Sequence, residues 1–423
     1  RRAGTLVEPL RIAFVIPVFP EIHNTFILNQ ITGLLDRGHD VHLYPLAVGS
    51  YERAHAEVST YGLRERDMHL PVPRDRLRRL TTALRHLVSP RSWNLGVMDA
   101  LNPLRGPEVW SLVPAYTALS FARQRDYDIV HAQFGHLAPP VERLLALGGV
   151  RGRLVASFRG ADTTSHLPRN PEAFARVFAR GSLFLPVSAD LEERLLAAGA
   201  PPEKTFVHRS GIDLKRFGFA PRGRSADEPT EVLFVGRFVE KKGVADALRA
   251  FAGALERLGA GSGGSPRARL TLVGSGPLEG RLRAVAAELG VERSVRFAGG
   301  DLDSRAVAEM MASSHLLIAP SVTAASGDAE GVPNVVKEAM ASGMPVLSTW
   351  HGGIPELVDD GVSGYLVEEG DVAALTSRLV ELIEGPEAWP ALGRAGRAKV
   401  EAEFDSERLN DLLVERYREA LKR

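Results

Sequence analysis

The sequence predicts an α/β protein built from two Rossmann-like, doubly wound parallel-sheet domains. The 423 residues exceed what one core usually holds, and short apolar runs alternate with segments of helical periodicity along the chain. A stretch without periodicity, "FAPRGRSADEPTE" (219–231), has two prolines and mixed charges and is typical of a linker. We therefore expect domains at 1–219 and 220–404, followed by a C-terminal helix at 405–423.

The expected strands are short runs rich in Val, Ile, Leu and Phe. In the first domain they lie at 11–19, 40–48, 127–135, 153–160 and 182–188. In the second domain they lie at 231–237, 269–276, 295–300, 315–321, 344–350 and 363–367. The C-terminal stretch carries an apolar stripe from Leu409 to Leu421 at helical spacing, with Asp405 or Ser406 as its N-cap. That stripe requires a surface on which to dock.

Composition restricts the class of protein. With 44% hydrophobic and 25% charged residues and a formal net charge of +0, the chain is typical of a soluble globular protein without a nucleic-acid footprint. The absence of cysteine excludes disulfides, a thiolate nucleophile and a cysteine metal cage, and it fits a reducing, cytoplasmic compartment. Charged residues and a proline interrupt the first apolar run, so we interpret it as a strand rather than a signal peptide.

Two acidic residues flank a predicted helix start in "EGVPNVVKEAMASGMPV" (330–346). Pro333 suits a first helical turn, so the helix begins between Glu330 and Glu338, and its N–H groups near Asn334 to Val336 form an anion site. Acids beside an anion site suit a ligand that alternates hydroxyls and phosphates, such as a nucleotide sugar. The alternative is a loop carboxylate followed by an ordinary solvated helix glutamate.

Basic residues follow the first strand of the second domain. In "VLFVGRFVEKKG" (232–243), Arg237 and Lys242 stand at the carboxyl end of the strand and can neutralise a diphosphate. The alternative is a set of unconnected surface charges. "LVGSGPLEG" (272–280) adds a turn with Gly274 and Gly276 that lets the backbone approach a ligand, although it matches neither common phosphate-loop motif.

At matching spacing, "GRFVEKKG", "VGSGPL", "EGVPNVVKE" and "GGIPELVDDGVSGYLV" resemble family 4 of the retaining glycosyltransferases, which have the two-domain GT-B fold with a cleft between the domains. "FPEIHNTFILNQITGLLDRGHDV", "DIVHAQFG" and "SGIDLKRF" extend the resemblance over nearly the whole chain. It is similar to the branch that builds exopolysaccharides and related glycoconjugates. The resemblance implies that the C-terminal helix returns to the first domain.

The resemblance also implies site roles. It places Arg237 and Lys242 on the donor diphosphate, Glu338 on the ribose, and Glu330 on the donor hexose. The backbone segment of Gly331, Val332, Pro333 and Asn334 accompanies Glu330, with N–H groups on every residue except the proline. On the acceptor side, the implied cleft residues are His23, Asn24, Thr25 and Asp162.

The chain departs from the family pattern at Arg159 in "SFRGADTT", where the family usually has histidine. An arginine cannot act as a base at neutral pH, so we expect Arg159 to add fixed positive charge for the donor, the acceptor or the leaving group. In a retaining mechanism the departing diphosphate can itself take the acceptor proton. His131 ends a predicted strand, and it is a candidate for a neutral hydrogen-bonding group or equally a satisfied structural histidine.

Two further signals are weaker. "DLD" (301–303) looks like a metal-binding motif, but Asp303 is more simply an N-cap, and we expect no metal.

The basic segment at 73–91 places leucines on one helix face. We interpret it as a helix that faces the core with a solvated basic side, and the alternative is peripheral contact with an anionic membrane.

The sequence therefore predicts a metal-independent, retaining transferase that moves a hexose from a nucleotide-diphosphate sugar to a hydroxyl acceptor. UDP-sugars are the first candidates as donor and GDP-mannose the second. A nucleotide-sugar 2-epimerase and a non-catalytic sugar-nucleotide or glycan-binding protein remain alternatives. The acceptor and the oligomeric state stay open.

Overall fold

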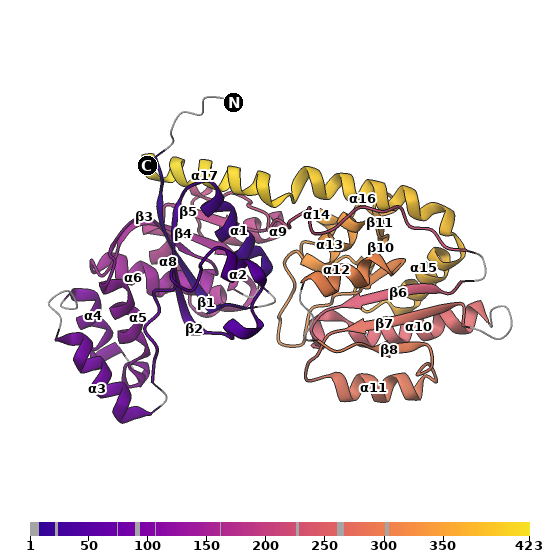
Figure 1. Cartoon of the computed structure of the whole chain (residues 1–423), viewed down its shortest axis with the longest axis horizontal. Coiled ribbons are helices and arrows are strands. Elements are labelled where there is room, and N and C mark those ends of the chain that lie inside the picture. The colour runs from indigo at the N-terminus through magenta and orange to yellow at the C-terminus, as the bar shows by residue number, and fades with distance from the viewer. Residues whose placement is uncertain are drawn as a thin grey trace. The chain divides into compact units, whose positions relative to one another are not determined.

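A computed structural model describes the chain over residues 8–21, 24–73, 75–88, 94–105, 107–160, 162–225, 228–259, 266–300 and 304–423 (Figure 1). The chain forms two compact units. Unit 1 comprises Arg1–Val187, Leu191–His208 and Asn410–Arg423, and unit 2 comprises Ser188–Asp190 and Arg209–Leu409.

Unit 1 is built on a five-stranded parallel sheet with strand order β2-β1-β3-β4-β5. Its strands are β1 (Arg11–Phe19), β2 (Asp40–Val48), β3 (Asp126–Ala132), β4 (Arg151–Phe158) and β5 (Leu183–Pro186). The helices are α1 (Thr25–Asp36), α2 (Ala56–Thr60), α3 (Arg76–Leu87), α4 (Leu95–Ala100), α5 (Val113–Ala122), α6 (Ala138–Ala146), α7 (Leu167–Arg169), α8 (Pro171–Arg180) and α9 (Ala189–Ala197).

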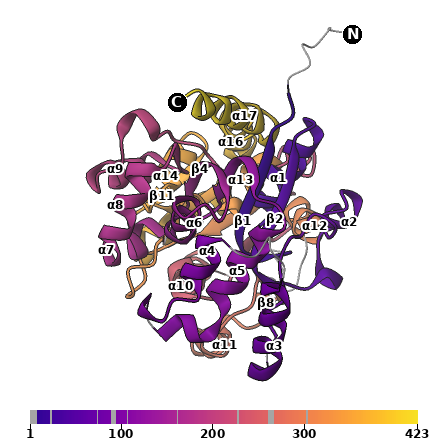
Figure 2. The same cartoon turned by 90° about the vertical axis from the view of Figure 1, so that its left-hand side faces the viewer.

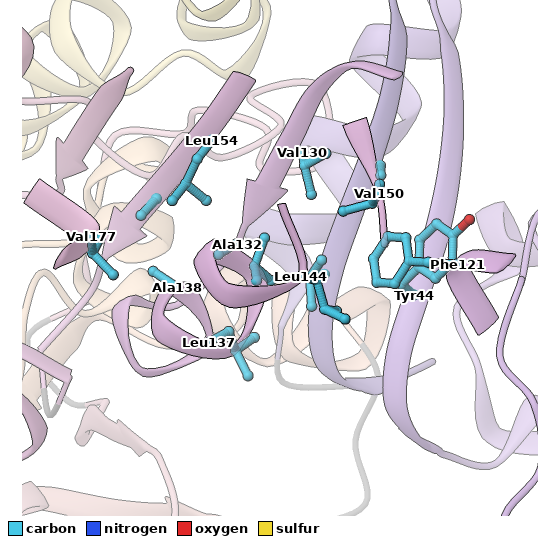
Figure 3. Close-up of a cluster of buried hydrophobic side chains, with 14 of the residues drawn as sticks. Tyr44, Phe121, Val130, Ala132, Leu137, Ala138, Leu144, Val150, Leu154 and Val177 are labelled. Carbon is cyan, nitrogen blue, oxygen red and sulfur yellow. The ribbon is translucent and has the colours of Figure 1, made fainter. Parts of the chain in front are cut away.

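Apolar side chains cover both faces of this sheet, as expected for parallel strands that read as continuous apolar runs. Figure 3 shows one of the two clusters, in which side chains from the strands meet those of α5, α6 and α8. At its edge the rings of Tyr44 and Phe121 stack with their centroids 3.8 Å apart. The first predicted core therefore lies where the strand pattern placed it.

Unit 2 contains a six-stranded parallel sheet with order β11-β10-β9-β6-β7-β8. Its strands are β6 (Thr230–Val235), β7 (Ala268–Val273), β8 (Val295–Phe297), β9 (Leu316–Ala319), β10 (Val346–Thr349) and β11 (Gly364–Val367). The helices are α10 (Val244–Leu258), α11 (Glu279–Glu288), α12 (Ser304–Ala312), α13 (Asn334–Ser342), α14 (Ile354–Leu357), α15 (Val372–Glu384) and α16 (Trp389–Glu403). The last helix, α17 (Ser406–Lys422), is divided between the two units. Each strand that the sequence predicts is present in one of the two sheets, so the predicted fold class is confirmed.

The boundary between the units differs from the predicted one at 219. The chain enters unit 2 at Arg209. Ile212 already forms a β-bridge with the segment just before α17. The Ile212 N–H donates to the Phe404 carbonyl at 2.9 Å, and the Ile212 carbonyl accepts from the Ser406 N–H at 3.0 Å. Ile212 and Phe217 are also buried in a cluster with residues of α13 and α16. The described part of the aperiodic stretch, from 219 to 225, therefore belongs to unit 2, where Arg222 is buried and most of its neighbours in sequence are exposed.

Helix α17 starts in unit 2 and continues into unit 1 at Asn410. Its buried residues Leu413 and Tyr417 belong to a cluster formed by β1, α1 and β3. Asn410 approaches α1 so closely that a Cβ at Gly33 would lie 2.0 Å from the Asn410 amide nitrogen, and this amide donates to the Asn29 carbonyl at 3.1 Å. The apolar stripe of the C-terminal helix therefore docks on the first helix of unit 1.

The predicted helix within 73–91 is present as α3, with Asp75 as its N-cap; Arg74 and Arg91 lie outside the described residues. The interpretation that its leucine face points into the core is wrong. Of the α3 side chains only Ala83 is buried, whereas Leu77, Leu80 and Leu84 are exposed. Figures 1 and 2 both show α3 at the outer edge of unit 1, with α5 between it and the sheet. The helix packs on unit 1 through Ala83 and the half-buried Leu87, and its other leucines face the solvent.

Candidate functional site

The candidate site lies at the carboxyl ends of β6 and β9 in unit 2. The chain runs from β6 outward through β7 and β8, and then crosses to β9 on the other side of β6. This reversal is the topological switch point of a doubly wound sheet, where the loops leaving two neighbouring strands diverge and ligands usually bind.

The loop after β6 is pressed against the end of β9. Gly243 has φ +62°, and a Cβ at this position would lie 1.7 Å from the carbonyl oxygen of Pro320. Only glycine permits this approach together with a left-handed backbone. As a result, the short helical turn Glu240–Lys242 and the segment after Ala319 share one edge of the sheet. Arg237, in the same loop, is exposed and forms no ion pair with any residue that the structure describes.

Glu330 is held by two lysines. Its Oε2 lies 2.9 Å from Nζ of Lys242 and its Oε1 lies 3.3 Å from Nζ of Lys241. Lys241 also lies 3.0 Å from Oδ1 of Asp328. The sequence-predicted pair Lys242 and Glu330 is therefore brought together, and Lys241 and Asp328 join it.

The lysines determine the charge state of Glu330. Burial raises the pKa of this carboxyl, but the adjacent Lys242 and Lys241 ammonium groups outweigh burial and bring it to about 2. Glu330 is therefore ionised at any neutral pH. The two lysines and the two carboxylates, Glu330 and Asp328, balance in formal charge (2 − 2 = 0).

Two residues that sequence reasoning missed orient Glu330. The backbone N–H of Glu330 donates to Nε2 of His351 at 3.0 Å, so Nδ1 of His351 carries the proton and donates to Oε1 of Glu369 at 2.5 Å. Glu369 also accepts from the Thr323 N–H at 2.7 Å. Burial opposes ionisation of Glu369, but these hydrogen bonds hold its pKa below the ordinary value. The carboxylate and the imidazole thus link the ends of β9, β10 and β11.

Helix α13 begins four residues after Glu330. Pro333 is its N-cap residue rather than its first helical residue, and Pro333 makes no side-chain cap hydrogen bond. The N–H groups of that turn, which includes Asn334, carry the positive end of the helix dipole. The preceding loop is fixed by the Gly353 N–H, which donates to the Gly331 carbonyl at 2.8 Å. Val332 and Pro333 lie between Gly331 and the first turn, so the whole predicted donor segment is contiguous with Glu330.

Glu338 lies in the second turn of α13, and its environment differs from that of Glu330. Burial raises the pKa of its carboxyl to about 7, although Lys337 and Arg216 lower it. The Lys337 ammonium group is hydrogen-bonded to a backbone group, since its Nζ donates to the Ser210 carbonyl at 2.7 Å. The two glutamates of the motif are therefore one permanently ionised group and one group that titrates near neutral pH.

The glycine turn after β7 packs against the loop after β6. A Cβ at Gly274 would lie 1.9 Å from the Gly236 carbonyl oxygen, and one at Gly276 would lie 2.6 Å from the Phe238 carbonyl oxygen. The Phe238 N–H in turn donates to the Ser275 carbonyl at 2.8 Å. Gly274 and Gly276 therefore support the Arg237 loop through close backbone packing.

Arg159 is anchored inside unit 1. Its Nε donates to the Gln133 carbonyl and its Nη2 donates to the Gln133 side chain, both at 2.9 Å. The guanidinium also stacks on Phe26, with Cζ 4.3 Å from the ring centre. Burial lowers the pKa of Arg159 to about 10, opposed by Asp162 and Tyr417, so the side chain stays charged at neutral pH. Arg159 is therefore a charged, anchored side chain, and its role toward the donor, the acceptor or the leaving group stays a prediction.

Asp162 serves the loop around Arg159. Its carboxylate accepts from the backbone N–H groups of Gly135, Arg159, Gly160 and Thr163 at 2.8 to 3.0 Å. The predicted place of Asp162 on the acceptor side stays a prediction, and in the described structure its oxygens accept from these four donors. Its role in the described structure is to shape the turn after β4.

His131 has both ring nitrogens hydrogen-bonded inside unit 1, which favours the structural alternative over the catalytic one. It is fully buried, Nδ1 lies 2.6 Å from the Tyr417 hydroxyl, and Nε2 lies 2.8 Å from the Ser157 hydroxyl. Burial, Arg159 and His208 lower its pKa well below the ordinary value. The neutral ring connects the sheet to α17 and has no nitrogen left for a substrate.

The remaining predicted residues are only partly described. His23 and the 301–303 stretch lie outside the described residues, so the structure does not test the N-cap at Asp303. Asn24 precedes α1 and donates to the Glu21 carboxylate, and Thr25 is the first residue of that helix. Within the described ranges, no group of three or more His, Asp or Glu side chains is placed to hold a metal ion.

Comparison with known proteins identifies the class. Residues 23–216 match the family described as Glycosyltransferase Family 4, and residues 219–399 match the family described as Glycosyl transferases group 1. WcaL of Salmonella typhimurium, assigned to colanic acid biosynthesis, is 34% identical over 412 residues, covering 96% of this chain and 98% of that protein. The amylovoran biosynthesis glycosyltransferase AmsK of Erwinia amylovora is 32% identical over 410 residues, with 94% and 96% covered. The chain belongs to glycosyltransferase family 4.

Solved structures agree on the architecture. The structure of Anabaena HepE in complex with UDP and glucose covers 96% of this chain and 98% of its own, with a TM-score of 0.67 at 19% identity. Sucrose-phosphate synthase from Thermosynechococcus elongatus covers the same shares, with a TM-score of 0.68 at 18% identity. The protein is a glycosyltransferase with the GT-B fold.

Proposed function

We propose that the protein is a metal-independent, retaining glycosyltransferase that moves a hexose from a nucleotide-diphosphate sugar to a hydroxyl acceptor. The observation that carries the proposal is the cluster of Lys241, Lys242 and Glu330 at the switch point of the unit 2 sheet, next to the first turn of α13. Cations beside a helix N-terminus bind phosphate, and an ionised carboxylate accepts from sugar hydroxyls.

The cluster suggests the order in which Lys242 and Glu330 contact the diphosphate and the hexose of the donor. Lys242 is paired with Glu330, and we propose that the donor diphosphate replaces Glu330 at this lysine. Glu330 is then released to accept hydrogen bonds from the hexose, while Lys242 and the exposed Arg237 stabilise the charge that grows on the departing diphosphate. The retaining step we propose breaks the bond between the sugar and the diphosphate. It forms the new bond on the same face, and the leaving phosphate oxygen takes the acceptor proton.

The donor, the biosynthetic role and the compartment are part of the proposal. UDP-sugars are the first candidates, supported by the UDP complex of HepE, and GDP-mannose is the second. The second is supported by a GDP-mannose-dependent mannosyltransferase of Corynebacterium glutamicum, 32% identical over 318 residues. The colanic acid and amylovoran relatives support a role in polysaccharide biosynthesis. The compartment we propose is the cytoplasm, because a chain without cysteine fits a reducing environment. Over the described residues, no helix has the length and apolar character needed to cross a membrane.

A panel of nucleotide diphosphates and nucleotide sugars in a thermal-shift assay tests this proposal. A ligand that binds only the folded protein, at about a hundred times its dissociation constant, adds about 2.7 kcal/mol to the free energy of unfolding. We expect a shift of this size with one base and its sugar conjugates, with and without a chelator. A panel in which no nucleotide raises the melting temperature would reject the nucleotide-sugar site.

Donor binding should depend on pH through Glu338. Its pKa of about 7 means that the carboxyl is largely protonated at about pH 6 and ionised at about pH 8. If the ionised form accepts the donor hydroxyls, affinity for a nucleotide sugar rises about tenfold over this range, because binding must release the proton at the lower pH. Titration calorimetry measures this, and nucleotide sugars are suitable because their diphosphate diester does not titrate there.

The matched variant is Glu338→Gln, which keeps the shape and removes the titration. We expect its affinity to be nearly independent of pH over the same range. An unchanged pH slope in the variant would show that another group is responsible.

A further inference from the structure

The strongest feature outside the site is an exposed apolar surface on unit 1. Sixteen large hydrophobic side chains are exposed among the described residues, and nine of them come from residues 77–113. On and directly after α3 they are Leu77, Leu80, Leu84 and Val88, followed by Leu95 and Met98 of α4, Leu104, Trp110 and Val113. Leu77 is 71% exposed, Val88 81%, Trp110 76% and Leu104 93%. Single exposed apolar residues are common, but several on one face of one helix mark a candidate interaction surface.

The α3 residues form one stripe. At about 100° per residue, Leu77, Leu80, Leu84 and Val88 fall within about 80° of the helix circumference. The opposite side of α3 is seated on unit 1: Ala83 is buried, Nη1 of Arg79 donates to the Ser111 carbonyl at 2.8 Å, and the Tyr116 hydroxyl donates to the Arg79 carbonyl at 2.8 Å. The helix is therefore anchored through one side and presents its apolar stripe outward.

The charge beside the stripe identifies the partner. The described residues 75–88 contain four arginines and one aspartate, a formal charge of +3 (4 − 1), and the aspartate is occupied as the N-cap. Arg78 and Arg85 lie on one side of the stripe and Arg76 on the other, and all three are exposed. Apolar residues flanked by arginines match an anionic bilayer, where leucines enter the acyl boundary and guanidinium groups contact phosphates.

A second copy of this chain fits less well. A two-fold contact through the stripe would bring the arginine flanks of two copies together, which is electrostatically unfavourable. We infer that α3 and the apolar residues that follow it form a docking surface for an anionic lipid membrane. This inference is independent of the donor chemistry, because it concerns binding alone.

Vesicle flotation with the full-length protein tests the inference. The two vesicle types are phosphatidylcholine alone and phosphatidylcholine with about 30% phosphatidylglycerol. We expect binding to the anionic vesicles, little binding to the neutral ones, and loss of binding as salt rises. Absence of binding to the anionic vesicles, or equal binding to both types, would overturn the inference.

Paired variants locate the surface. Leu77→Glu/Leu84→Glu should lower the bound fraction on anionic vesicles about tenfold or more, and Arg78→Gln/Arg85→Gln should lower it several-fold. The matched control is Leu196→Glu/Leu289→Glu, which places the same charges at exposed leucines of other helices and should bind like the wild type. Circular dichroism checks that each variant is folded.

Two outcomes would reject the surface as a membrane site. One is that Leu77→Glu/Leu84→Glu binds vesicles like the control. The other is a dimer in analytical ultracentrifugation that this variant dissociates, which would assign the surface to a second copy. Neither outcome affects the donor panel, so failure here is distinguishable from failure of the proposed function.

Discussion

Lys242→Ala should lower kcat/KM for sugar transfer about 10³-fold and leave the protein folded. The lysine would lose its contact with a diphosphate whose charge grows during bond cleavage, and removal of one such group typically costs a factor of about 10² to 10³ or slightly more. Stability should change little, by about 1 kcal/mol, because Glu330 keeps Lys241 at 3.3 Å and is not left as an unpaired buried charge.

Initial rates with the best donor of the thermal-shift panel, together with melting temperatures, measure both effects. Lys399→Ala is the matched control, since Lys399 is another partly buried lysine of unit 2 and lies 2.5 Å from Asp359, a carboxylate outside the site. It should keep nearly full turnover. Wild-type turnover in Lys242→Ala would contradict the role of this lysine on the diphosphate.

The fold was predictable because its signals are local. Parallel strands that are buried on both faces appear as apolar runs whatever the rest of the chain does, and each predicted run forms a strand. The domain boundary was less predictable, because Ile212 joins unit 2 through bonds to Phe404 and Ser406. No local pattern near 212 indicates a partner almost two hundred residues away.

The site also combines residues with local sequence signals and residues whose contacts depend on distant parts of the chain. Lys242 and Glu330 stand beside glycines and a helix start, so their neighbourhood in sequence already indicated a ligand. His351 and Glu369 each stand two residues beyond a buried strand, and β10 pairs with β11. This signal was available, since the carboxyl ends of neighbouring parallel strands meet, but their hydrogen bond depends on side-chain directions that only the folded structure provides.

At His131 the local sequence signal was ambiguous, and a distant residue decides between the alternatives. Its position at the end of a strand is typical of both catalytic and structural histidines, and the deciding partner is Tyr417, 286 residues later in the chain. The stripe of α3 was misread for a related reason. An apolar helix face predicts burial on average, but here Ala83 and the half-buried Leu87 make the apolar contact with unit 1, and Leu77, Leu80 and Leu84 stay exposed.

Glu330→Gln should separate binding from turnover. The substitution removes the carboxylate that competes with phosphate for Lys242, so affinity for a nucleoside diphosphate should rise about fivefold, equivalent to about 1 kcal/mol of lost competition. Turnover should fall at least about 10²-fold, because the hexose loses the group that orients it. Since the Glu330 carboxyl has a pKa of about 2, neither effect should vary across neutral pH.

Titration calorimetry with the diphosphate and initial rates with the sugar donor provide the two measurements. Asp328→Asn is the control, because Asp328 contacts Lys241 but leaves the pair between Lys242 and Glu330 intact. It should change diphosphate affinity much less. A purely structural ion pair would behave differently: its loss would loosen the loop, so affinity and turnover would fall together in Glu330→Gln. A rise in diphosphate affinity together with a fall in turnover is therefore specific to a carboxylate that first pairs with Lys242, is replaced there by the donor phosphates, and then binds the sugar.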